Sequence, residues 1–326
     1  MKLKDLGERK AQELIRDVLA LKTIDSAEMK DDCAVVEFGD GYLLITTDMI
    51  SQHTHIPEKA TFWQIGWHLV AINLSDIASM GGRPMGMVVA LGLPKDFEEE
   101  SLRNIISGMD SCSSKYDTCI LGGDTKEAKS LTLSGCAIGS VPKSEIMQRK
   151  GAKPRDIVAV TGELGKAGAA FHALKDNIDE ENVIKNLLEI NPRIQEGMAL
   201  SKTKVVTSCM DISDGLASSI HQLSSLNEVT FNIDFNKIPI SSNAKDISKK
   251  LDIPLEEPVL YMGGDYELLV TLMKDKVADA QKVLSDIGTT LTPIGEVKKD
   301  NKNILIKDGI STTLEYRGYE HFRWKA

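Results

Sequence analysis

The chain has 326 residues, of which 42% are hydrophobic and 27% are charged, a composition typical of a protein that folds throughout and long enough for two domains. Its net charge of -9 argues against a nucleic-acid partner, whose phosphates are neutralised by Lys and Arg. Residues Met1–Leu14 lack the apolar core of a signal peptide, and no apolar run approaches ~18 residues, so we expect a cytoplasmic protein without a membrane partner.

The first half of the chain alternates short β-branched runs with longer helical patterns. Cys33–Phe38 and Tyr42–Asp48 flank the turn residues Gly39-Asp40-Gly41 and predict a β-hairpin. The next elements are predicted in the order helix, strand, helix, strand, strand: Ala60–Met80, Met85–Leu93, Asp96–Tyr116, Thr118–Leu121 and Leu131–Val141.

A basic stretch containing Gly and Pro, between Pro142 and Arg155, predicts a domain boundary near Lys150 and hence domains of residues 1–149 and 150–326. The second half also mixes strands with helices, and this irregular alternation predicts an α+β fold. Its predicted strands are Asp156–Thr161, Val205–Cys209, Thr230–Phe235, Glu267–Leu272 and Asn303–Lys307. Its predicted helices are Ala169–Lys175, which follows a glycine-rich turn over Gly162–Gly168, Gly215–Leu226 and Asp275–Ile287.

Two carboxylates face each other in the predicted hairpin. A loop centred on Asp40 places Asp32 directly opposite Asp48, at a Cβ separation of ~4.5–5.5 Å where like charges repel. A cation bound between the two carboxylates would offset this repulsion and make the pair a metal site. An equally good explanation is that one carboxylate caps a strand end in solvent and the register slips.

A third carboxylate lies on the apolar face of the helix predicted over Ala60–Met80. Ile65, Leu69, Ile72 and Asp76 follow a 4-3-4 spacing that aligns them on one side of a helix. An unpaired buried carboxylate is costly, so Asp76 must be paired, protonated or bound to a metal. No Lys or Arg lies within a helical turn, although a salt bridge to a distant residue is the alternative.

Further carboxylates occur at two loops. Gly122-Gly123-Asp124 lies between strands, where glycine lets a ligand approach the backbone, although for this motif alone a plain turn is the better explanation. Asp211-Ile212-Ser213-Asp214 lies at a junction from strand to helix, where two acids and a serine exceed what helix capping requires. Such oxygen ligands suit magnesium. The P-loop, the protein-kinase motifs and the common hydrolase signatures are absent from the sequence.

Taken together, an ordered set of motifs resembles the thiamine-monophosphate kinase family over nearly the whole chain. The motifs are Lys30-Asp31-Asp32-Cys33-Ala34, Thr46-Thr47-Asp48, Asn73-Leu74-Ser75-Asp76, Gly122-Gly123-Asp124-Thr125, Lys150-Gly151-Ala152-Lys153-Pro154, Asn191-Pro192-Arg193, Asp211-Ile212-Ser213-Asp214-Gly215-Leu216, Gly263-Gly264-Asp265-Tyr266-Glu267-Leu268 and Arg317-Gly318-Tyr319-Glu320-His321-Phe322.

The resemblance implies an aminoimidazole ribonucleotide synthetase-like fold of two domains, with an N-terminal domain that forms a β-barrel across a homodimer interface and a C-terminal α/β sandwich. It implies transfer of the ATP γ-phosphoryl group to thiamine monophosphate, with several Mg²⁺ ions and with ATP as co-substrate. The implied Mg²⁺ ligands are Asp32, Thr46, Thr47, Asp48, Asp76, Asp124, Asp211 and Asp214. The implied ATP contacts are Gly123, Asp124, Arg149 and Ser213.

The resemblance also implies catalytic and substrate-binding roles. The catalytic residues would be Asp32, Asp76, Asp124, Asp211 and Arg149, and the substrate contacts would be His55, Tyr319 and Asp265. The family often reads Gly-Gly-Glu-Asp-Tyr-Glu-Leu, and this chain is one acidic residue shorter there, so we consider Asp265 as a replacement for that glutamate. The alternatives are another enzyme of the same superfamily, such as a hydrogenase maturation protein, and a nucleotide-binding regulator without activity.

Overall fold

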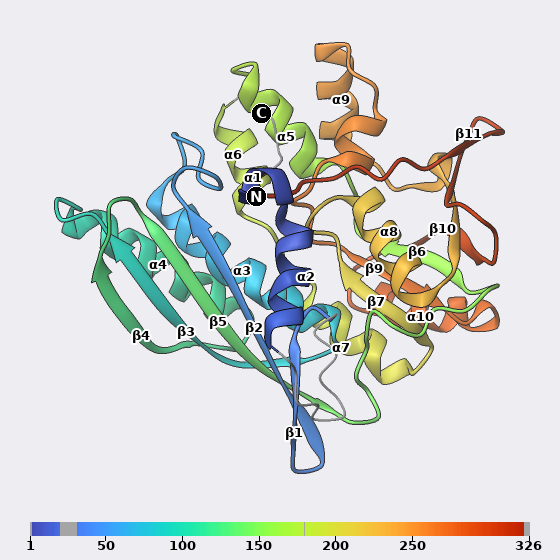
Figure 1. Ribbon diagram of the computed structural model, residues 1–326, viewed down its shortest axis with the longest axis horizontal. Helices are drawn as coiled ribbons and strands as arrows, with labels where there is room; N and C mark the ends of the chain where they lie inside the picture. Colours follow the sequence, from blue (N-terminus) through green and yellow to red (C-terminus); the bar gives the residue numbers. More distant parts are fainter. Residues whose placement is uncertain (1, 20–30, 179, 323–326) are drawn as a thin grey trace.

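A computed structural model describes residues 2–19, 31–178 and 180–322, so that Met1 and Lys30, which were considered above, lie outside the described residues. Figure 1 shows two sheets, each with its own helices, that meet along one side. The fold is therefore mixed α+β with two domains, as predicted. Within the described ranges, no helix combines the length and the apolar character needed to cross a membrane.

The N-terminal sheet has five strands in the order β1-β2-β5-β3-β4. Neighbouring strands are antiparallel, except that β3 and β4 run parallel. The strands are β1 (Ala34–Phe38), β2 (Gly41–Ser51), β3 (Arg83–Leu93), β4 (Ile120–Glu127) and β5 (Thr132–Pro142). Helices α3 (Phe62–Ser79) and α4 (Glu99–Lys115) cover one face of this sheet (Figure 1).

The C-terminal sheet has seven strands in the order β12-β11-β8-β10-β6-β9-β7, with helices on both faces. The strands are β6 (Ile157–Thr161), β7 (Val206–Asp211), β8 (Thr230–Asp234), β9 (Leu268–Leu272), β10 (Leu291–Lys298), β11 (Ile304–Lys307) and β12 (Ile310–Thr313). The helices are α5 (Lys166–Lys175), α6 (Glu180–Leu188), α7 (Ile194–Thr203), α8 (Leu216–Asn227), α9 (Ser242–Leu251) and α10 (Val277–Asp286), with short turns η1 (Phe235–Lys237), η2 (Glu257–Tyr261) and η3 (Lys274–Lys276).

Two N-terminal helices, α1 (Leu3–Leu6) and α2 (Glu8–Leu19), precede the first sheet. Figure 1 shows α2 where the two domains meet, close to the last segment of the chain. Hydrogen bonds between Glu8 and His321 and between Arg9 and Ser218 fix α2 to the C-terminal domain. The first residues of the chain therefore border the space between the domains.

Helix α3 is the central element of the N-terminal domain. Thr61 caps it, because the Thr61 hydroxyl accepts from the Gln64 N–H (3.2 Å) and the Gln64 side chain accepts from the Thr61 N–H (3.0 Å). Between Ile65 and Ser79 all residues except Asp76 are buried, so the helix is enclosed on every side. A polar group on this helix is therefore forced to find its partners inside the protein.

The register of the first hairpin differs from the prediction by one residue. Ala34 pairs with Ile45 and Phe38 pairs with Gly41, so the loop consists of Gly39 and Asp40 alone. Gly39 adopts φ +58°, which glycine accepts without steric cost and which makes so short a loop possible. The predicted cross-strand pairing of Asp32 with Asp48 is therefore wrong, and Asp32 precedes the strand.

Helix α5 begins earlier than predicted, at Lys166, inside the segment expected to be a glycine-rich turn. Its first turn is stabilised by Asp265, whose carboxylate accepts from the N–H groups of Gly165 (2.7 Å) and Ala167 (3.0 Å). The capping carboxylate is distant in sequence, so no local pattern reveals it. Helices α6, α7 and α9 and strands β10 and β12 were also not predicted.

Two glycines allow α3 and α4 to cross closely. A Cβ atom at Gly66 would lie 2.0 Å from the Ile105 carbonyl oxygen, and one at Gly108 would lie 1.9 Å from the Trp63 carbonyl oxygen. Backbone atoms cannot retreat from such a contact without moving a helix. The crossing therefore depends on the absence of side chains at these two positions.

Gly108→Ala is expected to lower the free energy of unfolding by about 1–3 kcal/mol, because the added methyl group forces the helices apart in a close-packed core. Urea unfolding measures this difference. Ser107→Ala, at the exposed neighbouring position of α4, is the control and should change stability by less than about 0.5 kcal/mol. Equal unfolding midpoints for the Gly108 variant and the wild type would contradict the close crossing.

Candidate functional site

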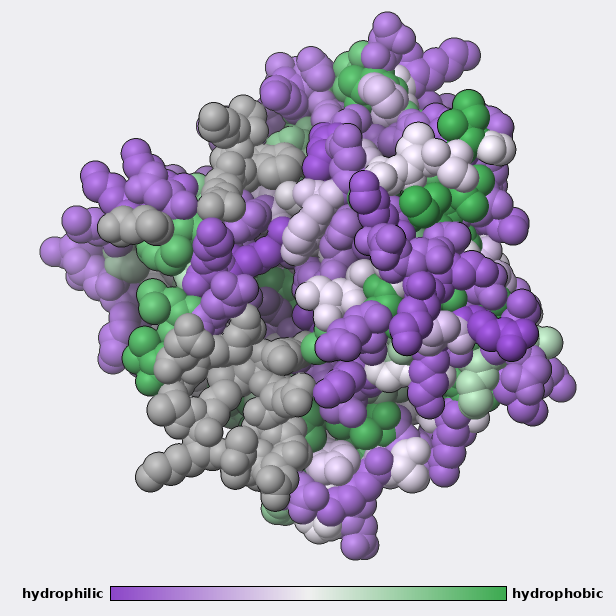
Figure 2. All heavy atoms as spheres, turned by 45° about the vertical axis from the view of Figure 1, so that its right-hand side comes forward, coloured by the Kyte–Doolittle hydropathy of each residue, from purple (hydrophilic) through white to green (hydrophobic). Residues whose placement is uncertain are grey.

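A cleft of about 1880 Å³ is lined by residues of both domains. Strand β2 and helix α3 contribute from the N-terminal domain, and the loop after β7 and the last segment of the chain contribute from the C-terminal domain. Figure 2 shows a hollow in the molecular surface that is bordered mainly by hydrophilic residues, next to the atoms drawn in grey. The cleft contains most of the carboxylates singled out from the sequence.

Three carboxylates meet in the cleft from three separate segments. Asp32 precedes β1, Asp76 lies on α3 and Asp211 ends β7. One oxygen of each lies within 4.8 Å of the others, an arrangement that could hold a metal ion. The Asp32 side chain is only 1% exposed and Asp211 only 2%, so water screens the three charges poorly. We call these three residues the carboxylate cluster.

Hydroxyl groups support each carboxylate of the cluster. Thr46 on β2 donates to Asp76 Oδ2, Ser75 donates to Asp211 Oδ2 (2.6 Å), and Ser79 donates to Asp32 Oδ2 (2.5 Å). We did not predict roles for Ser75 and Ser79. Their signal in the sequence is a pair of hydroxyls, one turn apart, inside a helix whose residues are mostly apolar.

The electrostatics of the cluster show too little positive charge. Burial, followed by the charges of Asp48, Asp211 and Asp32, raises the pKa of Asp76 well above its usual value. Burial and Asp32 raise the pKa of Asp211 to about 8. Both carboxyl groups therefore favour the protonated form unless a cation lies beside them.

Arg149 supplies part of the compensation. Its guanidinium donates to Asp32 Oδ1 through Nε (2.9 Å) and through Nη2, and Nη1 donates to Gln222 Oε1 (3.1 Å). Its backbone N–H donates to Asp31 Oδ1 (2.7 Å). Burial alone lowers the pKa of Arg149, but the charge and hydrogen bonds of Asp32 outweigh burial and raise it, so the guanidinium stays charged.

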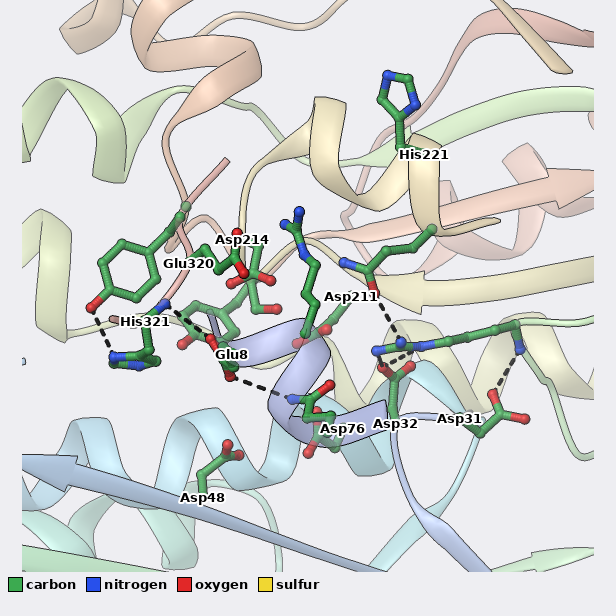
Figure 3. Close-up of a pocket in the computed structure, with 18 of the residues that line it drawn as sticks. Glu8, Asp31, Asp32, Asp48, Asp76, Asp211, Asp214, His221, Glu320 and His321 are labelled. Atoms are coloured by element: carbon green, nitrogen blue, oxygen red, sulfur yellow. Dashed lines mark hydrogen bonds and ion pairs between the residues drawn. The ribbon is translucent and has the colours of Figure 1, made fainter. Parts of the chain in front are cut away.

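Strand β2 directs two of the predicted ligands into the cleft. Thr46 is 7% exposed and faces α3, and Asp48 lies two residues further on the same face, with a pKa raised to about 6 by burial and by Asp32. Figure 3 shows the Asp48 side chain rising from the strand below the cluster. Thr47 also lines the cleft, but its hydroxyl donates to the Gly135 carbonyl oxygen (2.8 Å), on the other face of the sheet.

Gly123 and Asp124 do not join the cluster within one chain. Both lie on the edge strand β4, and the Asp124 side chain is 62% exposed, 3.3 Å from Lys126 Nζ. Neither residue lines the cleft. Their pairing with β3 places Asp124 beside Ala90, on the face of the sheet that the helices leave open.

Ser213 and Asp214 lie in the loop between β7 and α8 and line the cleft. The loop is held in place by the chain end, because the Tyr319 N–H donates to the Asp214 carbonyl oxygen (3.1 Å). Burial and the charge of Glu8 raise the pKa of Asp214 to about 6. Gly215 follows at φ +100°, a conformation that a residue with a side chain rarely adopts.

The predicted substrate contacts separate into two groups. His55 and Tyr319 line the cleft together with His321, which we did not predict. Asp265, by contrast, does not line the cleft, because its carboxylate accepts from backbone N–H groups at the start of α5. This arrangement gives no support to Asp265 as a substitute for a substrate-binding glutamate.

Comparisons with known proteins agree over the length of the chain. Residues 30–141 match the family model described as AIR synthase related protein, N-terminal domain, and residues 153–308 match the corresponding C-terminal domain. The thiamine-monophosphate kinase of Methanospirillum hungatei is 34% identical, over 97% of this chain and 99% of that protein. The enzyme of that name from Pyrococcus horikoshii is 32% identical, over 95% and 96%. A solved structure titled AaThiL complexed with AMPPCP and TMP superposes with a TM-score of 0.86 at 28% identity, over 98% and 99%.

Without metal, the protein is expected to lose stability as the pH rises from about 5 to about 8. The folded-state pKa of Asp211, about 8, exceeds the ordinary carboxyl value of 3.8, so between these values the folded protein binds more protons than the unfolded chain. The free energy of unfolding then falls as the pH rises. Asp211→Asn should reduce this fall by roughly 1–3 kcal/mol.

Urea unfolding in EDTA at about pH 5.5 and about pH 8 measures this difference. Asp96→Asn, which changes an exposed carboxyl, is the matched control and should keep the wild-type dependence. The same loss of stability in the wild type and the Asp211 variant would show that the raised pKa of Asp211 does not cause the pH dependence.

Proposed function

Since the chain belongs to the thiamine-monophosphate kinase family, we propose that it transfers the γ-phosphoryl group of ATP to thiamine monophosphate and so produces thiamine diphosphate and ADP. The observation that carries this conclusion is the buried carboxylate cluster beside Arg149 in the cleft between the domains. The similar structure with AMPPCP and TMP adds support, because a nucleotide analogue occupies that relative.

The donor set of the cleft fits magnesium. Carboxylate and hydroxyl oxygens are the ligands that Mg²⁺ prefers. The raised pKa values of Asp76 and Asp211 show that a nearby cation would favour the ionised form of both groups. When bound, Mg²⁺ neutralises phosphate charge and orients the reacting groups. We propose the ligands Asp32, Thr46, Thr47, Asp48, Asp76, Asp124, Asp211 and Asp214.

We propose direct in-line transfer. The nucleophile is a phosphate oxygen of thiamine monophosphate, which is largely deprotonated at neutral pH because its second pKa is ~6, so no general base is needed. The bond from this oxygen to the γ-phosphorus forms as the bond to the β–γ bridging oxygen breaks, and ADP leaves with that electron pair. Arg149, which stays charged, stabilises the negative charge on the transferred group.

We propose that the remaining site residues form two groups, one that binds ATP and one that binds thiamine monophosphate. Gly123, Asp124, Arg149 and Ser213 would contact ATP, and His55 and Tyr319 would contact the thiamine part of the acceptor. Asp32, Asp76, Asp124 and Asp211 would act in catalysis as metal ligands. We retain Asp265 as a structural residue that caps α5.

We propose that two copies of the chain pack through the open face of the N-terminal sheet and complete a β-barrel there. This face exposes large apolar side chains, among them Met49 (59%), Met85 (52%) and Val88 (40%), which water would otherwise contact. Asp124 and Gly123 lie on the same sheet and outside the cleft of their own chain. We propose that they act across this interface.

Two further predictions concern organisation and location. We propose that the N-terminal ATP- and Mg²⁺-binding domain comprises residues 1–149 and the C-terminal α/β domain residues 150–326. We propose a cytoplasmic location, which is supported by the five cysteines, because Cys33, Cys112, Cys119, Cys136 and Cys209 form no disulfide.

Purified protein incubated with ATP, Mg²⁺ and thiamine monophosphate should form thiamine diphosphate and ADP in equal amounts. EDTA should abolish the reaction, and Asp76→Asn should lower kcat by at least about 100-fold, since charge stabilisation dominates this transfer. Chromatography of the nucleotides and thiamine phosphates measures both products, and Asp96→Asn is the control.

Binding of ATP without any thiamine diphosphate would sink the proposal. It would favour another enzyme of the superfamily, of the aminoimidazole ribonucleotide synthetase or hydrogenase maturation type, or a nucleotide-binding regulator. A phosphorylated enzyme trapped by rapid quench would overturn direct transfer while leaving the substrates unchanged.

Arg149→Met should lower kcat by about 100- to 1,000-fold, because methionine fills much of the space but cannot stabilise the transferred phosphoryl group. Arg149→Lys should recover only part of the loss, since an ammonium group lacks the fork that contacts Asp32 twice. Steady-state kinetics at saturating ATP test both variants. An unchanged kcat with a raised KM alone would assign Arg149 to binding rather than to catalysis.

Val88→Glu should convert the proposed dimer into a monomer, because the interface would bury an unpaired charge. Analytical ultracentrifugation measures the mass relative to the 35.7 kDa chain. Ile287→Glu, an equally exposed apolar position (41%) at the end of α10, is the matched control and should leave the mass unchanged. A wild-type protein that sediments as a monomer would refute the dimer.

A further inference from the structure

Three rings gather in the cleft away from Arg149. The His55 and His321 ring centroids are 5.0 Å apart, and Tyr319 meets His321 edge to face with centroids 4.8 Å apart. The Tyr319 hydroxyl and His321 Nδ1 lie within hydrogen-bond distance, 3.2 Å. Figure 3 shows His321 and Asp32 on opposite sides of Asp76. We call His55, Tyr319 and His321 the ring group.

A carboxylate from the other end of the sequence joins the ring group. Glu8, the first residue of α2, accepts a hydrogen bond from the His321 backbone N–H at Oε2 (3.0 Å). After burial, the charge of Glu8 is the largest cause of the raised pKa of Tyr319. Figure 3 shows Glu8 close to Asp214 and Glu320, so this part of the cleft is negative.

Within the described ranges, the Glu8 carboxylate accepts hydrogen bonds from the Gln12 side chain (3.4 Å) and the His321 backbone N–H, and neither donor is a cation. Burial, followed by the neighbouring His321, lowers the pKa of His55 to about 4, so this imidazole is neutral at pH 7. Arg9 is directed elsewhere, because its Nη2 donates to Ser218 Oγ (3.0 Å) and its guanidinium carbon lies 4.5 Å from the centre of the Tyr316 ring.

The neutral His55 imidazole and the aromatic ring of Tyr319, beside a carboxylate, form an environment for a flat organic cation. Ring faces attract cations through their quadrupole, and the carboxylate adds a full opposite charge. The thiazolium ring of thiamine monophosphate carries a permanent positive charge that no pH change removes. Its positive charge complements this part of the cleft, while its phosphate must reach the carboxylate cluster.

We propose that Glu8 is a specificity-determining residue whose carboxylate, together with His321, holds the thiazolium cation of the acceptor against the ring group. This inference rests on the proposed kinase function and adds a residue from α2 to the substrate site. Neither Glu8 nor His321 was predicted from the sequence, because they come from opposite ends of the chain.

Glu8 has two other possible roles that the test must separate. A carboxylate in the first turn stabilises a helix through its dipole, and Glu8 occupies that position in α2. It also lies close enough to Asp214 to raise its pKa, so it could serve a metal bound there. Either role would affect every acceptor equally, whereas contact with the thiazolium affects only a cationic acceptor.

The experiment compares thiamine monophosphate with its neutral isostere, in which thiophene replaces thiazolium. The wild type should prefer the cationic acceptor by at least about tenfold in kcat/KM. Glu8→Gln should raise KM for thiamine monophosphate about tenfold with little change in kcat, and should leave the neutral isostere unaffected, so that the preference disappears. Glu8→Asp should retain part of it.

Glu163→Gln, which removes an exposed carboxylate outside the cleft, is the matched control and should behave as the wild type. Equal losses with both acceptors, or a higher Mg²⁺ requirement in Glu8→Gln, would overturn the proposal in favour of the helix or metal role. A wild type without preference would overturn it without any variant. A wild type that phosphorylates neither acceptor would instead refute the proposed function.

Discussion

The rest of the structure depends on holding three carboxyl groups together where water screens their charges poorly. Asp32, Asp76 and Asp211 lie within a few ångströms of one another, and burial raises the pKa of Asp76 and Asp211 instead of allowing free ionisation. Such a cluster opposes folding, so the surrounding packing must be strong enough to close it. Hydroxyl donors and one arginine reduce the repulsion, and a cation would remove most of it.

Helix α3 holds the cluster in place because it contacts both domains. It carries Asp76 toward β2 and directs the Ser75 hydroxyl to Asp211 in the other domain. A Cβ atom at Gly197 of α7 would lie 2.1 Å from the Ala78 carbonyl oxygen, so a C-terminal helix also approaches α3 to backbone distance. The Trp67 indole N–H donates to the Ile190 carbonyl oxygen (2.9 Å) and ties the same helix to the following segment. These contacts hold α3, and with it one side of the cleft, in a fixed position relative to the C-terminal domain.

The sequence predicts those parts of the site that a single element determines. Spacing along one helix was enough to predict that Asp76 lies among apolar residues and needs a partner, although the structure encloses α3 on every side and leaves Asp76 its least buried residue between Ile65 and Ser79. Features that depend on two distant segments could not be predicted from the sequence. Asp265 determines where α5 begins, and Glu8 contacts His321 only in the folded chain. The hairpin itself was predicted correctly, but its register was not, because a loop shorter by one residue reverses the faces of a strand and no local preference distinguished the two lengths.

Under the proposed roles of Arg149 and Glu8, the charges of the cleft favour one orientation of the acceptor. At the cluster, an approaching phosphate meets carboxylates, so it can bind only where Arg149 and added cations reverse the local field. At the ring group, Glu8, Asp214 and Glu320 repel a phosphate, and the described part of the chain gives Glu8 no ion pair, so a cationic ring is favoured there. A molecule with a phosphate at one end and a cationic ring at the other therefore has one favourable direction. The same negative cleft that seems unsuited to two anionic substrates becomes selective for an acceptor that is anionic at one end only.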